Sequence, residues 1–322
     1  MATKTSPKKT KQKETISVVI PCYNEEDVIE LCHEELTKVV DTLPFRFEII
    51  FINDGSTDKT FEHLLNIQKS DSRVVVLNLS RNFGKEAAMT AGIDHCTGDA
   101  LIILDADLQD PPALIPDIID VWKETGADVV YGQRVIREGE TWFKKFSANG
   151  FYKIINFIAS NVEIPRNTGD FRLMNRRAID ALIQLREKHR FMKGLFAWIG
   201  YNQVAFEYNR APRAAGHTKW SYVGLWNLAM EGIAGFSTTP LKLASFMGLM
   251  ISFLAFLYGA YIIATTLIYG VDVPGWATLT VMISVLSGIQ LLCIGILGEY
   301  IGRIFGEAKK RPLYFIENVY KK

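Results

Sequence analysis

The chain has 322 residues, enough for one catalytic domain and a smaller appendage, and its 36 basic and 35 acidic residues leave a net charge of +1. That balance averages over two unlike parts, because the sequence has ordinary mixed polarity up to about Phe236, whereas residues 243–269 and 276–301 are almost wholly apolar. The cysteines show no paired spacing, which excludes a cysteine-based metal site and a disulfide framework; they are Cys22, Cys32, Cys96 and Cys293.

The first segment, residues 1–14, is polar and rich in lysine and has no apolar core, so the sequence predicts no signal peptide there. We expect a disordered basic tail. Its lysines either touch anionic lipid or stay solvated without a role.

Apolar strand-like runs alternate with amphipathic stretches from residue 16 to residue 132. The predicted strands are 16–21, 47–53, 74–79, 100–104 and 128–132, and the predicted helices are 25–43, a stretch from Asp58, 85–96 and one starting at Pro111 and Pro112. Runs that are apolar on both faces are typical of a parallel sheet covered by helices. The sequence therefore predicts an α/β fold, a Rossmann-like doubly wound sheet.

Polar residues follow each predicted strand. They lie at 22–25, 53–54, 80–84, 105–109 and 133–134. Because ligands bind beyond the carboxyl ends of the strands in an open parallel sheet, we expect these residues to converge on one binding site.

Asp105 and Asp107 come directly after an apolar strand and are followed by Gln109. Two carboxylates at a strand end predict a site for Mg²⁺ or Mn²⁺, hard cations that prefer oxygen ligands and also accept substrate phosphates. The metal would neutralise a diphosphate leaving group. An Asp-x-Asp on a solvated loop is the alternative interpretation.

The ends of the first two strands have the composition of a nucleoside pocket. Tyr23 is suited to lie against a base, Glu25 and Asp54 are suited to accept hydrogen bonds from base or ribose, and Gly55 permits a sharp turn. A plain Asx turn is the alternative at Asp54. No Gly-x-Gly-x-x-Gly and no Gly-Lys-Ser/Thr loop is present in the sequence, which argues against a dinucleotide dehydrogenase and a P-loop phosphotransferase.

Two apolar runs, 243–269 and 276–301, exceed the roughly 20 residues that span a hydrocarbon core. Their joining loop carries Asp272 and no lysine or arginine, whereas basic residues follow the second run, so both ends are predicted to be cytoplasmic at the plasma membrane. Before them, 142–159 mixes aromatic and aliphatic residues with lysines, and 220–236 mixes aromatic and aliphatic residues at lower charge. We interpret both as interfacial helices, with packing on the sheet as the alternative.

The predicted domains are a disordered basic tail (1–14), a cytoplasmic catalytic domain (15–219), an interfacial helix and linker (220–240), a two-helix transmembrane domain (241–303) and a cytoplasmic basic tail (304–322).

Several motifs in order resemble one family. They are 19–26, 51–58, 81–86, 105–112, 168–173, 216–220 and 294–303. Together they resemble the inverting glycosyltransferases with the GT-A fold and, more narrowly, the polyprenyl-phosphate glycosyltransferases, relatives of dolichol-phosphate mannose synthase. The two-span form is similar to the GtrB-type enzymes that load undecaprenyl phosphate with glucose. One departure is Ala215, where the family usually has a bulkier residue.

The resemblance implies roles at the matching positions. Asp105, Asp107 and Gln109 would hold the metal; Pro21, Tyr23, Glu25 and Asp54 would hold uridine; Asp170 would lie beside the acceptor as a third catalytic residue; Arg134, Arg172, Arg210, Arg213 and Lys219 would surround the phosphates.

The resemblance implies transfer of glucose from UDP-glucose to undecaprenyl phosphate at the cytoplasmic membrane face, by one inverting displacement that needs Mg²⁺ or Mn²⁺. UDP-GlcNAc, a modified pentose donor and GDP-mannose stay open as alternatives. We expect a homo-oligomer, because Gly298 and Gly302 have the spacing of close helix packing, and no nucleic-acid partner. The rivals are a processive polysaccharide synthase, whose Gln-x-x-Arg-Trp signature is absent from the sequence, and a non-catalytic nucleotide-sugar-binding membrane scaffold.

Overall fold

The structure is a computed structural model, and it describes residues 13–135, 165, 167–188, 190–209, 237–270 and 275–322. The tail up to residue 12 and the two expected interfacial helices, 142–159 and 220–236, lie outside the described residues, as does Ala215.

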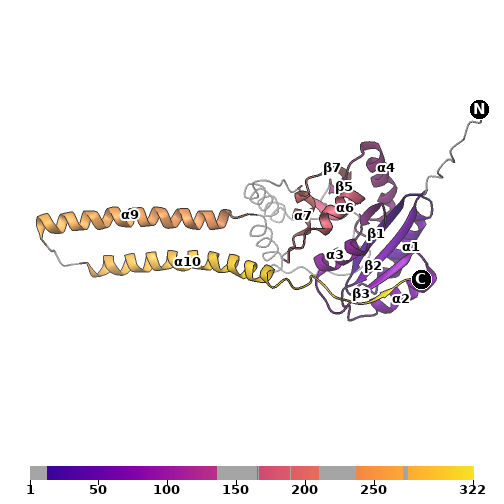
Figure 1. The fold of residues 1–322 in the computed structure, drawn as a ribbon, viewed down its shortest axis with the longest axis horizontal. Coiled ribbons are helices and arrows are strands. Elements are labelled where there is room, and N and C mark those ends of the chain that lie inside the picture. Colours follow the sequence, from indigo (N-terminus) through magenta and orange to yellow (C-terminus); the bar gives the residue numbers. More distant parts are fainter. Residues whose placement is uncertain (1–12, 136–164, 166, 189, 210–236, 271–274) are drawn as a thin grey trace, which may run out of the picture.

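An eight-stranded sheet forms the centre of the catalytic part, in the order β7-β5-β6-β4-β1-β2-β3-β8 (Figure 1). The strands are β1 (Thr15–Cys22), β2 (Arg46–Asn53), β3 (Val74–Leu79), β4 (Ala100–Ile103), β5 (Val129–Arg134), β6 (Thr168–Asn175), β7 (Gln203–Tyr208) and β8 (Ile316–Tyr320). The five predicted strands are confirmed as β1 to β5. β1 to β4 pair in parallel, as predicted, but β6 and β8 are antiparallel to their neighbours, so the sheet is mixed.

Helices cover both faces of this sheet. They are α1 (Ile29–Val40), α2 (Thr60–Ser70), α3 (Lys85–His95), the short η1 (Pro112–Leu114), α4 (Ile115–Thr125), α6 (Arg176–Ile183) and α7 (Met192–Trp198). Successive side chains of a strand point to opposite faces, so Val18 and Ile20 join the core under α1, α2 and α4, while Val19 joins the core under α3, α6 and α7. These two cores hold the strand ends in fixed positions.

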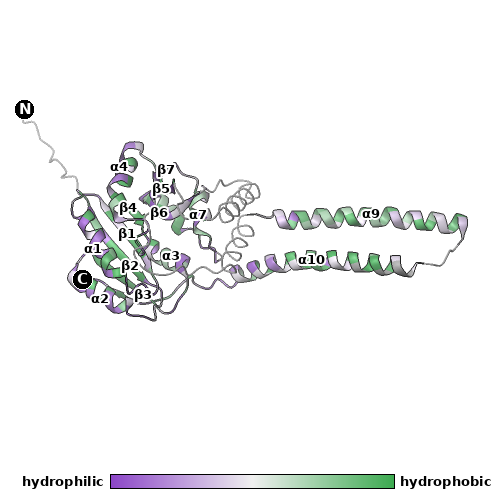
Figure 2. Cartoon of the chain, turned by 180° about the vertical axis from the view of Figure 1, so that it is seen from behind, coloured by the Kyte–Doolittle hydropathy of each residue, from purple (hydrophilic) through white to green (hydrophobic). Residues whose placement is uncertain are grey.

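Two long helices form a hairpin that extends away from the sheet, α9 (Thr239–Tyr269) and α10 (Trp276–Ala308) (Figure 1). Figure 2 shows that hydrophobic residues recur along much of both helices. By length and composition, Thr239–Tyr269 and Val281–Ala308 are candidate membrane spans, and both predicted spans fall within these helices. Tyr300 Oη donates a hydrogen bond to the carbonyl oxygen of Ser237 at 2.7 Å, which ties α10 to the segment that leads into α9.

The chain returns from the hairpin to the sheet, and residues 316–320, expected in a basic tail, form the edge strand β8 beside β3. Glu317 accepts a hydrogen bond from Asn78 Nδ2 at 2.8 Å, and Asn78 Oδ1 accepts one from Asn53 Nδ2 at 2.8 Å. The backbone N–H of Ser80 donates to Phe315 O at 3.0 Å. The C-terminal segment therefore contacts the β3–α3 loop directly.

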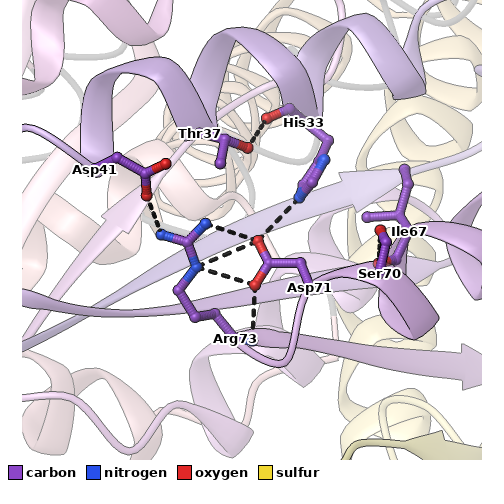
Figure 3. Close-up of polar contacts among 7 residues, drawn as sticks. All are labelled: His33, Thr37, Asp41, Ile67, Ser70, Asp71 and Arg73. Atoms are coloured by element: carbon purple, nitrogen blue, oxygen red, sulfur yellow. Dashed lines mark hydrogen bonds and ion pairs between the residues drawn. The ribbon is translucent and has the colours of Figure 1, made fainter.

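A charged cluster lies where β3 begins, at the opposite end of this strand from the β3–α3 loop (Figure 3). Arg73 donates to both carboxylate oxygens of Asp71 and, at 2.5 Å, to Asp41 at the end of α1. His33 of α1 contacts Asp71 at 3.2 Å. The cluster joins α1 to the α2–β3 turn, far from the strand ends where ligands are expected.

Candidate functional site

The loops after β1 and β2 are joined by hydrogen bonds between side chains and backbone. Thr57 N–H donates to Asn24 Oδ1 at 2.8 Å, and Glu25 N–H donates to Thr60 Oγ1 at 2.8 Å. Asn24 has a left-handed backbone with φ of 53°, which asparagine tolerates better than most residues. Because these contacts hold the loop in a non-helical path, α1 begins at Ile29 and not at Glu25 as the spacing predicted.

The residues predicted to hold the nucleoside lie along this joined pair of loops. Pro21 is buried near the end of β1, opposite Ile52 of β2. Tyr23 is 37% exposed, and Glu25 is half-buried. The structure thus brings these three residues to the carboxyl edge of the sheet, where the strand-end rule places a ligand.

Asp54 is 2% exposed and fastens the β3–α3 loop. Its carboxylate accepts the backbone N–H of Phe83 at 2.7 Å and of Gly84 at 2.9 Å. Burial raises the pKa of Asp54 above its usual value, although these two hydrogen bonds oppose the rise. A Cβ on Gly55 would lie 2.4 Å from the nitrogen of Asn82, so only glycine fits beneath this loop. The sequence predicted a nucleoside ligand for Asp54; in the structure its carboxylate binds protein backbone.

Lys85, the first residue of α3, joins two carboxylates that come from different strands. Its Nζ lies 2.7 Å from Asp105 Oδ1 and 2.6 Å from Asp170 Oδ2. Asp105 follows β4 and Asp170 lies near the start of β6, and the antiparallel register, with Ile103 opposite Arg172, brings the two together. Two residues predicted for separate tasks therefore share one ammonium group.

The charges of this triad are strongly coupled. Burial lowers the pKa of Lys85, but the two carboxylates outweigh it and hold the pKa above its usual value. Burial works to raise the pKa of Asp170, yet Lys85 and Lys193 hold it below its usual value. Burial raises the pKa of Asp105, and the negative charge of Asp170 adds to the rise. Near neutral pH Lys85 is charged and Asp170 is ionised.

Asp107 and Gln109 continue from Asp105 along one turn. Asp105, Asp107 and Gln109 are half-buried and alternate along the turn with the buried Ala106 and Leu108. Leu108 has φ of 58°, and Gln109 N–H donates to Asp107 Oδ1 at 3.1 Å. Gln109 Oε1 is buried without a hydrogen-bond partner among the described residues. A buried amide oxygen without a donor is suited to a cation.

Arg134, predicted to bind phosphate, belongs to a buried network at the end of β5. Its Nη2 lies 3.2 Å from Asp110 Oδ2, and its Nε donates to Tyr208 Oη at 3.2 Å. Tyr208 Oη donates in turn to Asp110 Oδ1 at 2.6 Å. A Cβ at Gly169 would lie 2.5 Å from Arg134 Nη2, so glycine is needed for this approach. In this arrangement the network holds Arg134 close to the start of β6.

Arg172, also predicted to bind phosphate, is 3% exposed. Its Nη2 donates to Gly169 O at 2.9 Å, its Nε donates to Asp170 O at 3.2 Å, and its guanidinium lies 3.4 Å from the centre of the Phe196 ring. Burial lowers the pKa of Arg172 to about 10. These contacts stabilise the backbone that carries Asp170. Arg210, Arg213 and Lys219 lie outside the described residues.

The oxygen ligands at the end of β4 fit a divalent metal only as an incomplete set. Across the part of the chain that the structure describes, no three His, Cys, Asp or Glu side chains gather closely enough to hold an ion. Asp105 already contacts a cation, the Lys85 ammonium, and Gln109 Oε1 adds an oxygen without a donor. Hard cations such as Mg²⁺ take few protein carboxylates and complete their shells with water and substrate phosphate. The set therefore fits a metal that arrives with a phosphate ligand.

Lys85, Asp110 and Tyr208 were not among the predicted site residues. Lys85 directly follows the polar residues at 80–84, so extending that strand-end segment by one residue would have included it. Asp110 and Tyr208 have no such signal, because their contact depends on β7, a strand that the sequence pattern did not predict.

Residues 17–183 match the family Glycosyl transferase family 2, and residues 239–304 match the GtrB C-terminal hairpin. The chain is similar to an uncharacterised glycosyltransferase of Synechocystis, with 50% identity over 95% of each chain. It is 46% identical to the prophage bactoprenol glucosyl transferase homolog of Escherichia coli, over 95% of this chain and 99% of that one. It is also 46% identical to the bactoprenol glucosyl transferase of Shigella phage SfV, over 94% of this chain and 98% of that one.

Among solved structures, the chain resembles glucosyl-3-phosphoglycerate synthase from Mycobacterium tuberculosis in complex with Mn²⁺, UDP-glucose and phosphoglyceric acid. The TM-score is 0.46 and the identity is 22%, over 69% of this chain and 78% of that chain.

Proposed function

This chain belongs to glycosyl transferase family 2, and from that premise we propose that it transfers glucose from UDP-glucose to a polyprenyl phosphate at the cytoplasmic membrane face. One observation carries the proposal: a single chain combines two features. The first is a family 2 sheet in which Asp105 and Asp170 both contact Lys85, and the second is a hairpin of two candidate membrane spans. Relatives at 45–46% identity that are named bactoprenol glucosyl transferase support both the sugar and the lipid.

The donor would bind along the loops after β1 and β2. Tyr23 offers an exposed aromatic face for the base, and Glu25 a carboxylate for the hydroxyl or amide groups of the nucleoside. Asp105, Asp107 and Gln109 would hold Mg²⁺ or Mn²⁺, which supplies positive charge to the departing diphosphate. Asp54 would contribute indirectly, because its carboxylate fixes the backbone of the loop that leads to Lys85.

The acceptor would not need a strong general base, because a lipid phosphate is already ionised near neutral pH. Asp170 is suited to positioning, since Lys85 and Lys193 hold its pKa below the usual value and an ionised carboxylate of low pKa abstracts protons poorly. The phosphate oxygen would attack the anomeric carbon as the sugar–diphosphate bond breaks, in one displacement with inversion. Arg134 near the start of β6 and the basic residues at 210–219 would lower the free energy of the two phosphates.

The hairpin would place this site at the bilayer. We propose that both ends of the hairpin face the cytoplasm, since Lys242 lies in the first turn of α9 and Arg303, Lys309 and Lys310 lie in the last part of α10 and just after it. The reaction centre would then lie on the side where soluble UDP-glucose is available.

The test is an assay of purified protein in lipid nanodiscs with undecaprenyl phosphate and radiolabelled UDP-glucose, in which lipid-linked sugar is measured after organic extraction. Asp105→Asn and Asp107→Asn should each lower turnover by about a hundredfold or more, because each removes charge that would bind the metal. Asp120→Asn, an exposed carboxylate of α4, is the matched control and should keep full turnover.

UDP-GlcNAc and GDP-mannose, offered in parallel, test the donor, and the anomeric configuration of the product tests inversion. Full turnover by both acidic-pair variants would contradict the metal assignment. Transfer from another donor in place of UDP-glucose would contradict the sugar.

A further inference from the structure

Lys85 is placed to act as a counter-cation inside the proposed metal site. Its ammonium lies within 2.7 Å of carboxylates from two strands, Asp105 and Asp170. Without a positive charge between them these carboxylates would repel each other, and the repulsion would be strong because both are largely shielded from water. The ammonium therefore stabilises the arrangement of the two strands when no metal is bound.

The backbone of Lys85 is fixed, whereas its side chain is free to move. Gly84 precedes it with φ of 94°, and the Gly84 N–H is held by Asp54. The β3–α3 loop is held from the other side by Phe315, whose carbonyl accepts from Ser80 and whose ring lies 6.3 Å from that of Phe83. The Lys85 side chain itself is 43% exposed and has four rotatable methylene groups. The ammonium can leave Asp105 without any movement of the main chain.

A divalent ion on Asp105 and this ammonium compete for one carboxylate. Metal–oxygen distances near 2.1 Å and an ammonium 2.7 Å from the same carboxylate bring three positive charges close together, which is strongly unfavourable. The repulsion is relieved when a diphosphate adds negative charge, because its oxygens can accept hydrogen bonds from the ammonium and also coordinate the metal. The metal and the nucleotide should therefore bind together.

We propose that Lys85 occupies the metal-free site as a resident cation, and that the metal binds tightly only with the nucleotide diphosphate, to which the ammonium moves from Asp105. This inference rests on the proposed function, since it takes Asp105 as a metal ligand. Lys85 is a positioning residue in the metal-free protein and contacts the donor in the loaded protein. The site thereby discriminates against free metal without any additional ligand.

The experiment measures Mn²⁺ binding to the full-length protein in nanodiscs by electron paramagnetic resonance of the free ion, with and without UDP. In the wild type, UDP should tighten Mn²⁺ binding strongly. Lys85→Met should tighten binding of Mn²⁺ alone by about tenfold and reduce the additional effect of UDP by a similar factor, because it removes the competing charge. Lys85→Arg keeps the charge and should retain the wild-type pattern. Lys38→Met, on the exposed face of α1, is the matched control.

The outcomes separate the two proposals. If the wild type binds no Mn²⁺ even with UDP, the metal assignment fails and this inference fails with it. If the wild type binds Mn²⁺ with UDP but Lys85→Met binds Mn²⁺ alone no more tightly than the wild type, only the role of Lys85 is overturned. If Lys85→Met proves unstable, Lys85→Arg decides, since loss of the UDP effect in that variant would also overturn the role.

Discussion

The sheet and the membrane hairpin contain similar apolar residues and use them in opposite ways. Phe51 of β2 is 0% exposed, whereas Phe256 of α9 is 72% exposed and Leu267 is 82% exposed. In α9 only Ala244 is buried. The sheet completes its own core, and the hairpin does not.

The difference shows that apolar content alone does not define a core. Each buried apolar side chain contributes about 1.5–3 kcal/mol in water, and the hairpin forgoes this gain unless lipid covers its surface. Exposed apolar area of this extent is typical of a surface that lipid or another protein covers. The sheet buries its own apolar residues, while the candidate spans of the hairpin leave theirs exposed.

The largest expected effect comes from the same truncation made in each region. Phe51→Ala should lower the free energy of unfolding by about 3–5 kcal/mol, because it leaves a cavity in a closed core. Phe256→Ala should change it by about 0.5 kcal/mol or less, because lipid fills the space. Urea unfolding in nanodiscs, followed by circular dichroism, measures both. Equal losses would show that the hairpin has a protein core of its own.

A charge placed in the hairpin should have the next largest effect. Leu254→Arg lies midway along α9 and should cost about 2.5–3.5 kcal/mol of membrane insertion. Leu31→Arg, an exposed leucine of α1, is the matched control and should have no effect on insertion. Carbonate extraction of membranes, with the protein quantified in pellet and supernatant, measures the result. Retention of both variants in the pellet at wild-type levels would place α9 outside the lipid.

Lowering the pH should destabilise the sheet domain more than α9. The sheet domain contains the charged cluster around Asp71, whereas α9 contains no Asp or Glu. Burial opposes the shift, but Arg73 and His33 lower the pKa of Asp71 from 3.8 to about 2. A lowered carboxylate pKa stabilises the fold above the unfolded value near 4, and that contribution disappears as pH falls through 2. Asp71→Asn should therefore cost about 1–2 kcal/mol at pH 7 and nearly nothing at pH 2.

Urea titrations of wild type and Asp71→Asn at pH 7, 4 and 2 measure this difference. A difference in unfolding free energy that stayed constant over this range would show that the amide loses packing and not charge.

The smallest effect should come from a fully exposed ion pair. Lys38 and Glu35 of α1 lie 2.7 Å apart with 63% and 45% of their side chains exposed. Water and salt screen such pairs, so Lys38→Ala should leave the urea midpoint unchanged within experimental scatter. A measurable loss that disappeared in high salt would show that this exposed ion pair contributes to stability.

The sequence was sufficient to predict the elements whose apolar runs are continuous, and so β1 to β5 and both long helices are confirmed. It was insufficient for β6, where Asp170, Arg172 and Asn175 interrupt the apolar pattern, and for β8, five residues within a basic segment. A short strand that pairs with distant residues depends on tertiary contacts, which a local pattern does not contain.

Some residues of the candidate site could likewise be predicted from the local sequence, whereas others depend on tertiary contacts. Asp105 and Asp107 were predicted from their place after one strand, which is local information. The contact of Lys85 with Asp170 joins residues 85 positions apart and requires the antiparallel entry of β6 beside β4. The role of Asp54 likewise depends on a loop about 30 positions later in the chain. Residue types were predictable, and their partners were not.

The edge strand β8 also has a consequence for the order of biosynthesis. Glu317 and Asn78 are 239 positions apart, and the entire hairpin is translated between them. At about 5–20 residues per second, a ribosome needs roughly 12–48 s to cover that distance. During this interval β3 exposes an unpaired edge, which invites wrong pairing. The loop that leads to Lys85 thus acquires its last contacts only after both candidate spans have been translated, so the candidate site is completed later than the hairpin.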